Sequence, residues 1–135
     1  MKIQDTLTGK EKELDKSGNV RIYLCGVTVY DESHIGHART VIVFDVLRRY
    51  LESKGGWVDF IQNFTDVDDK IINRAKRENV RASAISSRYI DNYFKDFDDL
   101  NVLRATRYPK ATEHIQDMLN FIKSLVDKNI AYTSK

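Results

Sequence analysis

The sequence lacks the features that mark secreted and membrane proteins. It has one cysteine, Cys25, so no disulfide can form within the chain, and we expect a reducing compartment. Its longest stretch without a charged residue is Ile22–Tyr30, which is far shorter than the roughly 18 to 20 residues of a membrane span. Met1 to Leu14 contain no apolar block of the kind found in signal peptides. These absences predict a cytoplasmic protein with no membrane contact.

An excess of charge of one sign is also missing. The 22 Lys and Arg residues are balanced by 20 Asp and Glu residues, which leaves a net charge of +2. This balance excludes a strongly basic nucleic-acid arm, so contact with nucleic acid requires a local patch. The 135 residues, 41% of them hydrophobic and 31% charged, suit one globular domain.

The first half of the chain alternates strand and helix patterns. After a lead-in with one short strand (residues 1–18), the apolar, β-branched run Val20–Cys25 predicts a strand. Apolar residues at helical spacing then predict a helix over Arg39–Lys54. Trp57–Phe64 predicts a second strand that begins with a core tryptophan. A helical crossover of this length joins parallel strands, so we expect a parallel, right-handed βαβ unit.

The second half has helical patterns. Thr65 or Asp66 is expected to cap a helix that continues to about Arg77. An apolar stripe predicts the next helix, on residues Ile85, Tyr89, Tyr93, Phe97 and Leu100. After an irregular segment around Pro109, Thr112 is expected to cap a last helix with an inward face of Ile115, Met118, Leu119, Ile122 and Leu125. Residues 131–135 resemble the opening of another strand.

The connection between the first strand and the first helix carries the strongest chemical signal. His34 and His37 stand three positions apart at the helix entrance, so both rings project from one face beside free backbone N–H groups. This arrangement suits an anion, above all a polyphosphate, and Gly36 leaves room for a base or sugar. Ligands of open α/β sheets bind at the carboxyl ends of the strands, where this connection lies. The alternative is a helix cap with exposed rings.

Several blocks of the sequence resemble one family. His34-Ile35-Gly36-His37 resembles the signature of class I aminoacyl-tRNA synthetases. The segments on either side, Cys25–Asp31 and Asn63–Ile72, are similar to the cysteinyl-tRNA synthetases, as is Pro109–Ile115. The blocks occur in the family's order from about residue 2 to the last residue, and Val27 replaces a proline that many members carry.

The resemblance implies a fold and a reaction. The fold is α/β: the first half of a Rossmann-like, nucleotide-binding class I catalytic fold over residues 1–80, then a mainly helical segment over residues 81–135 that includes the start of an inserted region. The reaction activates L-cysteine with ATP and Mg²⁺ to cysteinyl-adenylate and passes the cysteinyl group to tRNA(Cys), in a monomeric enzyme. No Lys-Met-Ser-Lys-Ser-like loop occurs in the sequence, so we expect a truncated chain that is inactive alone.

The resemblance also implies the residues of the site. His34 and His37 are the implied catalytic residues, because they would stabilise the charge that grows on the departing pyrophosphate. The implied nucleotide-binding residues are Tyr30, Asp31, His34, Gly36 and His37, and the implied substrate-binding residues are Cys25, Gly26, Thr28 and Thr65. Cys25 is also the implied ligand of a Zn²⁺ ion that binds the substrate thiolate, with the other zinc ligands beyond residue 135.

Simpler interpretations stay open for three of these residues. Cys25 can be a small buried hydrophobic residue, Thr65 a helix cap and Tyr30 a packing residue. Two rival functions are also open for the whole chain. One is a related ligase that joins cysteine to an amino-sugar compound, and the other is a nucleotide-binding module without catalysis.

The charged residues outside the motif are expected to have structural roles. An acidic trio resembles a magnesium site, but helix capping explains it better; its members are Asp66, Asp68 and Asp69. His114 is expected on the surface of the last helix. A set of basic side chains either meets tRNA or is only solvated: Arg48, Arg49, Lys54, Arg74, Lys76, Arg77 and Arg81.

Overall fold

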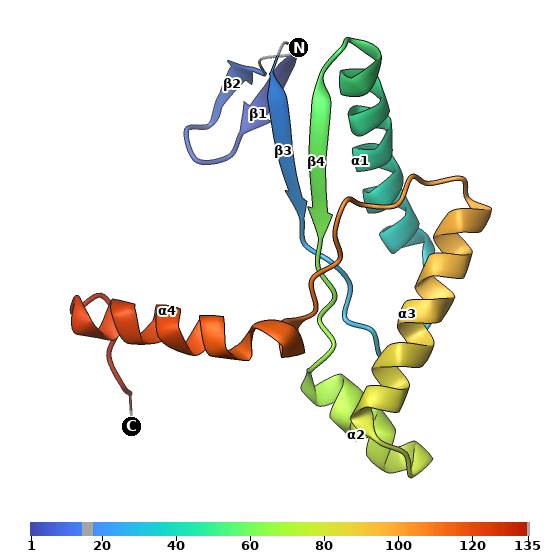
Figure 1. Ribbon diagram of the computed structural model, residues 1–135, viewed down its shortest axis with the longest axis vertical. Coiled ribbons are helices and arrows are strands. Elements are labelled where there is room, and N and C mark those ends of the chain that lie inside the picture. The colour runs from blue at the N-terminus through green and yellow to red at the C-terminus, as the bar shows by residue number, and fades with distance from the viewer. Residues whose placement is uncertain (15–17, 135) are drawn as a thin grey trace.

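The computed structural model describes residues 1–14 and 18–134 (Figure 1). Its strands are β1 (Lys2–Asp5), β2 (Lys10–Glu13), β3 (Asn19–Leu24) and β4 (Trp57–Gln62). Its helices are α1 (Ile35–Ser53), α2 (Asp69–Glu78), α3 (Ala82–Asp99), the 3₁₀ turn η1 (Ala111–His114) and α4 (Ile115–Asp127). None of the helices in these two ranges is long and apolar enough to cross a membrane.

The βαβ unit forms as predicted. β3 and β4 pair in parallel, from Asn19 opposite Trp57 to Leu24 opposite Gln62, and α1 is the crossover between them. The segment around Pro109 extends this arrangement, although its sequence gives no strand signal. The Thr106 N–H donates to the Phe60 carbonyl at 2.7 Å, and the Phe64 N–H donates to the Pro109 carbonyl at 2.9 Å. A third parallel segment therefore lies beside β4.

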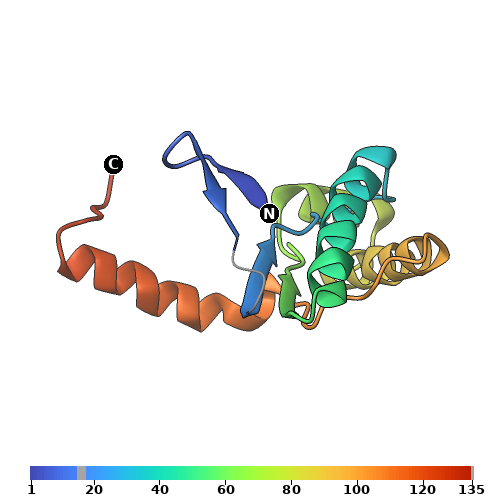
Figure 2. The same cartoon turned by 90° about the horizontal axis from the view of Figure 1, so that it is seen from above.

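The core lies between one face of this sheet and the helices α1 and α3, which occupy the same side in both views (Figures 1 and 2). Phe60 and Phe64 are buried there, and the Tyr93 hydroxyl donates to Gln62 Oε1 at 2.8 Å. Burial raises the pKa of Tyr93, so its hydroxyl stays protonated and available as a donor.

The opposite face of the sheet is only partly covered by the described residues. Parallel sheets are normally covered on both faces, yet Tyr23 on β3 is 65% exposed and Trp57 on β4 is 55% exposed. The prediction that Trp57 belongs to the core is therefore wrong. Sequence pattern marks Trp57 as apolar, but it does not say which side of the strand meets a helix.

The N-terminal lead-in contains two strands where the sequence predicted one. β1 and β2 form an antiparallel hairpin in which Lys2 lies opposite Glu13 and Asp5 opposite Lys10. Both strands are polar, so neither has the alternating apolar pattern that marks a half-buried strand. Residues 15–17 of the predicted lead-in lie outside the described residues.

The caps of two helices differ from prediction. Asp68 caps α2 by accepting from the Lys70 N–H at 2.8 Å, whereas Thr65 still pairs with the neighbouring loop. The Asp66 carboxylate accepts instead from Thr112, from its N–H at 2.9 Å and from its hydroxyl at 2.5 Å. Thr112 itself lies inside η1 rather than at the cap of the last helix.

Helix α4 does not bury the face predicted to point inward. Met118 is 44% exposed and Leu119 is 54% exposed, and no residue of α4 is buried. Figure 2 shows why: α4 extends away from the sheet on the side opposite α1 and α3. The predicted inward positions Ile115 and Ile122 are exposed as well, and only Leu125 is half-buried.

Two smaller predictions also fail. Leu100 is 50% exposed because it follows the last residue of α3, whereas the other four members of the apolar stripe are buried. Residues 131–134 form no strand, and Lys135 lies outside the described residues.

Candidate functional site

The candidate site is built on the loop that joins β3 to α1, at the carboxyl ends of the two parallel strands. Its central part is tied to the residues after β4: the Thr65 N–H donates to the Val27 carbonyl at 3.1 Å, and the Val29 N–H donates to the Thr65 carbonyl at 3.3 Å. Thr28 and Thr65 therefore face each other as an isolated parallel bridge. These two predicted substrate-binding residues lie side by side, and neither caps α2.

Gly26 occupies a position that no larger residue can take without moving the loop. A Cβ atom added there would lie 1.4 Å from the backbone oxygen of Asn63. The same Asn63 holds the loop through its side chain, since its Oδ1 accepts from the Gly26 N–H at 2.8 Å and from the Tyr23 hydroxyl at 3.0 Å. Asn63 was not predicted as a site residue. Its position directly after β4, inside a family block, was the only available signal.

Cys25 is exposed at the end of β3, so the interpretation as a buried hydrophobic residue is wrong. Its Sγ has only a 3.8 Å contact to the adjacent Gly26 carbonyl. An accessible thiol fits one position of a zinc site. The described residues bring no group of three or more His, Cys, Asp or Glu side chains together around a metal position, and zinc needs three or four protein ligands. These residues alone therefore do not form a complete zinc site.

The two histidines form one stacked unit at the start of α1. His34 is the N-cap, and its Nδ1 accepts from the Gly36 N–H at 3.1 Å. The His37 Nδ1 accepts in turn from the His34 N–H at 3.3 Å, and the ring centroids are 3.8 Å apart. A nitrogen that accepts carries no proton, so each neutral ring has its proton on Nε2. Within the described part of the chain neither Nε2–H has a hydrogen-bond partner, so both can donate to a ligand.

The surroundings of His37 favour the neutral ring. Partial burial lowers the pKa of His37 from its ordinary value, and the neighbouring His34 lowers it further. Gly36 permits the stack, because a Cβ there would lie 2.9 Å from Cε1 of the His34 ring. The structure thus gives Gly36 a role in shaping the cap, besides the predicted role of leaving room for a base or sugar.

Tyr30 and Asp31 lie against α2. The Asp31 carboxylate accepts from the Glu32 N–H at 2.9 Å and pairs with Arg74 at 2.8 Å, and these partners lower the pKa of Asp31. The Lys70 ammonium lies 5.2 Å from the centroid of the Tyr30 ring. Two of the predicted nucleotide-binding residues line different hollows: Tyr30 lines one beside α2, and His34 lines another beside Asp96 and Asp99 of α3.

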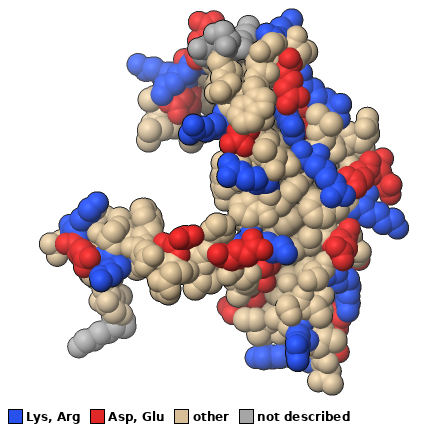
Figure 3. Space-filling view, in the orientation of Figure 1, with Lys and Arg blue, Asp and Glu red and all other residues tan. Residues whose placement is uncertain are grey.

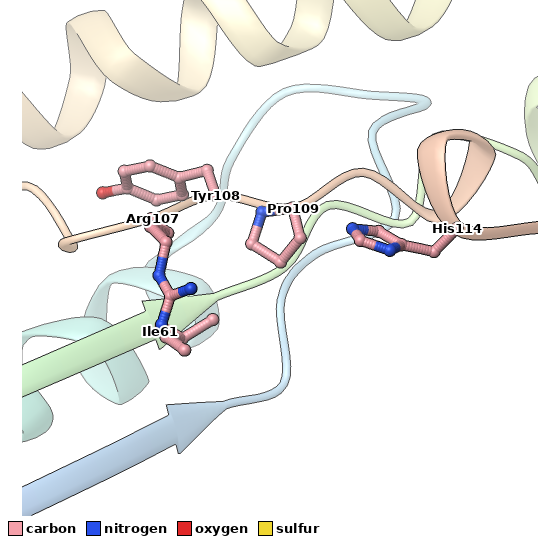
Figure 4. Close-up of a pocket in the computed structure, with 5 residues that line it drawn as sticks. All are labelled: Ile61, Arg107, Tyr108, Pro109 and His114. Atoms are coloured by element: carbon pink, nitrogen blue, oxygen red, sulfur yellow. The ribbon is translucent and has the colours of Figure 1, made fainter. Parts of the chain in front are cut away.

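The remaining charged residues have mainly structural roles. Of the acidic trio, Asp68 caps α2 as the capping interpretation predicts, Asp69 lies in the first turn of that helix, and Asp66 binds Thr112 instead of capping α2. His114 is exposed and pairs with Asp117 at 2.9 Å, as its predicted surface position implies. It also lines an open, mainly apolar hollow of about 590 Å³ with Ile61 and with residues 107–109 (Figure 4).

Several residues of the predicted basic surface already interact with neighbouring side chains. Arg48 pairs with Glu52 at 2.9 Å, and Arg49 pairs with Asp45 at 2.8 Å. Arg74 is held by two carboxylates, and Lys54 lies over the ring of Tyr50. Figure 3 accordingly shows positive and negative side chains interspersed over most of the visible face. Four of the predicted cations have no ion pair within the described residues: Lys54, Lys76, Arg77 and Arg81.

Comparison with known proteins gives consistent results. The family described as "tRNA synthetases class I (C) catalytic domain" matches residues 11–135. A cysteine–tRNA ligase of Caldicellulosiruptor saccharolyticus is 53% identical over 134 residues, which are 98% of this chain and 29% of that protein. One of Persephonella marina is 52% identical over 134 residues, 98% of this chain and 28% of that protein. The chain thus spans less than a third of the length of these relatives.

A solved structure has a similar fold. The Mycobacterium tuberculosis methionyl-tRNA synthetase in complex with methionyl-adenylate matches with a TM-score of 0.60 at 22% identity. The match covers 69% of this chain and 18% of that chain. At this level of identity the likeness concerns the fold, which agrees with the predicted Rossmann-like α/β class.

Proposed function

The chain belongs to the class I (C) tRNA synthetase catalytic domains, and we propose that it forms the part of a cysteine–tRNA ligase that binds ATP and cysteine. The observation that carries the proposal is the stacked pair of His34 and His37, whose two Nε2–H donors are unused at the N-terminus of α1. The exposed thiol of Cys25, at the end of the strand that leads into the same loop, supports cysteine as the amino acid.

In the proposed first step, the carboxylate of L-cysteine attacks the α-phosphate of ATP. The new bond joins the carboxylate oxygen to phosphorus, the bond to the bridging oxygen breaks, and pyrophosphate leaves with the bonding electrons. His34 and His37 donate from Nε2 to phosphate oxygens, whose charge grows as the bond breaks. Because both rings are fixed by their Nδ1 hydrogen bonds, these donors need no reorganisation during the step. Mg²⁺ bound to the ATP would neutralise part of its charge.

The substrate cysteine is proposed to lie over the loop made by Cys25, Gly26 and Thr28, with Thr65 beside it. A zinc ion held by Cys25, together with ligands that the described residues do not supply, would provide a soft Lewis acid that binds the substrate thiolate in preference to a serine hydroxyl. Asn63 would act as a positioning residue, because it fixes Gly26 and with it the direction of the Cys25 side chain. The third substrate is tRNA(Cys), which accepts the cysteinyl group, and we propose a cytoplasmic monomer.

The test uses the complete product of the gene that encodes this chain. We expect ATP–pyrophosphate exchange that depends on cysteine, is at least about a hundredfold slower with serine, and is followed by charging of tRNA(Cys). Exchange without tRNA charging, but with transfer to an amino-sugar acceptor, would favour the related ligase. Nucleotide binding without any exchange would favour the non-catalytic module and contradict the proposal.

A further inference from the structure

The hollow that Tyr30 lines lies along the exposed side of α2. It has a volume of about 580 Å³ and is lined by Tyr30, Lys70, Asn73, Lys76 and Arg77. We call it the α2 groove. Every lining residue except Tyr30 belongs to α2, and none of the five is acidic. Figure 3 shows a group of positive side chains at the lower end of the molecule, where Figure 1 has α2.

The positive charge of the α2 groove is only slightly offset by the described residues, since Arg77 has a minor part in lowering the pKa of Asp31. None of their ion pairs includes Lys70, Lys76 or Arg77. The contrast with Arg74 on the same helix is clear, because Arg74 pairs with Asp31 at 2.8 Å and with Glu78 at 2.7 Å. Arg74 thus ties α2 to the loop, whereas the three groove cations are free to meet an outside anion.

The Tyr30 ring gives the groove a fixed wall. The Lys70 ammonium lies 5.2 Å from the centroid of that ring, and a cation in this position is attracted by the ring face. The loop that carries Tyr30 is anchored next to it, since Asn92 of α3 donates to Glu32 at 2.9 Å. The cations therefore line a surface of defined shape.

We propose that the α2 groove binds the phosphate backbone of the tRNA, an inference that rests on the proposed function. Lys70 and Arg77 are seven residues apart on the helix, which corresponds to about 10 Å along its axis. Charges spread over that length match the repeated phosphates of a polynucleotide better than one small anion. The amide of Asn73 adds a neutral donor between them, of the kind that also contacts nucleic-acid phosphates.

The charge and shape of the α2 groove favour a nucleic acid as its partner. Phosphate contacts by Lys and Arg position a nucleic acid without reading its sequence. The groove is open along the helix, which suits a long ligand that passes over the surface. It is a different hollow from the one that His34 lines, and Tyr30 is the only implied nucleotide-binding residue among its described lining residues.

The experiment compares two double variants of the complete gene product. Lys76→Gln with Arg77→Gln removes two groove cations, and Lys10→Gln with Lys54→Gln removes two exposed cations from the hairpin and from the far end of α1. Binding of tRNA is measured by fluorescence anisotropy over a range of salt concentrations. We expect the groove variant to bind tRNA roughly ten- to a hundredfold more weakly near 0.1 M salt, with a salt slope reduced by about two. The control pair is expected to bind as the wild type does.

Two further arms separate the effect of charge from side-chain identity and from ATP binding. Lys76→Arg with Arg77→Lys keeps both charges at the end of α2, and is expected to restore binding. The KM for ATP in cysteine-dependent exchange is expected to stay unchanged in all variants. The inference would be overturned by an unchanged tRNA affinity in the groove variant or by an equal loss of affinity in the control pair. It would also be overturned if the KM for ATP rose when the groove cations are removed and returned to normal when both charges are kept. A wild-type protein that binds tRNA but does not charge it with cysteine would instead contradict the proposed function.

Discussion

The βαβ unit and α4 both contain apolar residues at regular spacing, but they differ in whether those residues are buried. In the unit, Leu51 of α1 is completely buried and its neighbours on β4 are buried with it. In α4, Leu119 repeats at the same helical spacing and is 54% exposed. A periodic pattern predicts that a helix has an apolar face. Whether the face is buried depends on which other segments reach it, and none of the described residues covers α4.

The largest effect is expected at the tightest contact of the βαβ unit. Gly26→Ala places a methyl group where the Asn63 backbone oxygen already lies, so the loop or the end of β4 has to move. We expect a loss of about 4 kcal/mol or more in the free energy of unfolding, measured by urea titration. Gly18→Ala is the matched control, because a Cβ there has nothing within 4 Å. Equal losses for the two variants would contradict the close contact.

The difference in burial between the βαβ unit and α4 is tested by one pair of substitutions. Leu51→Ala leaves a cavity in the core and is expected to cost about 3 kcal/mol. Leu119→Ala, which removes the same atoms from an exposed position, is expected to cost less than about 0.5 kcal/mol. Urea unfolding of the 135-residue chain measures both. Similar costs at the two sites would show that α4 is packed in solution.

Asn63→Ala is expected to have an intermediate effect. It removes the acceptor of the Gly26 N–H and of the Tyr23 hydroxyl, which costs about 1 to 2 kcal/mol. In the complete gene product we also expect the KM for cysteine to rise more than the KM for ATP, because the loop beside Cys25 is released. Asn63→Asp keeps an oxygen acceptor and is expected to retain most of the affinity. An Asn63→Ala enzyme with a normal KM for cysteine would assign Asn63 a purely structural role.

The smallest effect is expected in the dependence of stability on pH. The pKa of His37 lies below its ordinary value of 6.5, so folding favours the neutral ring. This contribution is fully present above that value and is lost as pH falls through the lower pKa of the folded state. Unfolding free energies between about pH 7.5 and pH 5 should therefore fall more steeply for the wild type than for His37→Gln. Parallel curves would contradict the burial of the ring.

Local patterns were sufficient to predict β3, β4, α1 and the positions of the two histidines at the start of that helix. β-Branched runs and helical spacing depend on neighbouring residues, and His34 and His37 meet because they are one helical turn apart. The family blocks added Cys25, Gly26, Thr28 and Thr65, and the structure brings the two threonines together. The chemistry assigned to these positions stays a prediction.

Contacts between distant segments could not be predicted from the sequence. Asp66 looks like a helix cap, but its carboxylate binds Thr112, which is 46 residues away. Asn63 reaches Gly26 across 37 residues. Neither pairing has a local signal. The Asn63–Gly26 contact depends on the register of β3 and β4, and the Asp66–Thr112 contact depends on the segment around Pro109 that lies beside β4. Trp57 was misplaced for the same reason, since only the register of the sheet decides which face it occupies.

The most direct test of the central claim is the rate of cysteinyl-adenylate formation in the complete gene product. Single-turnover reactions with ATP and cysteine would compare the wild type with His34→Ala and His37→Ala. Each variant is expected to form the adenylate about ten- to a thousandfold more slowly, because a fixed donor to the departing pyrophosphate is lost, while the KM for cysteine changes little. An unchanged rate in both variants would contradict the claim that the stacked histidines stabilise the reacting phosphates.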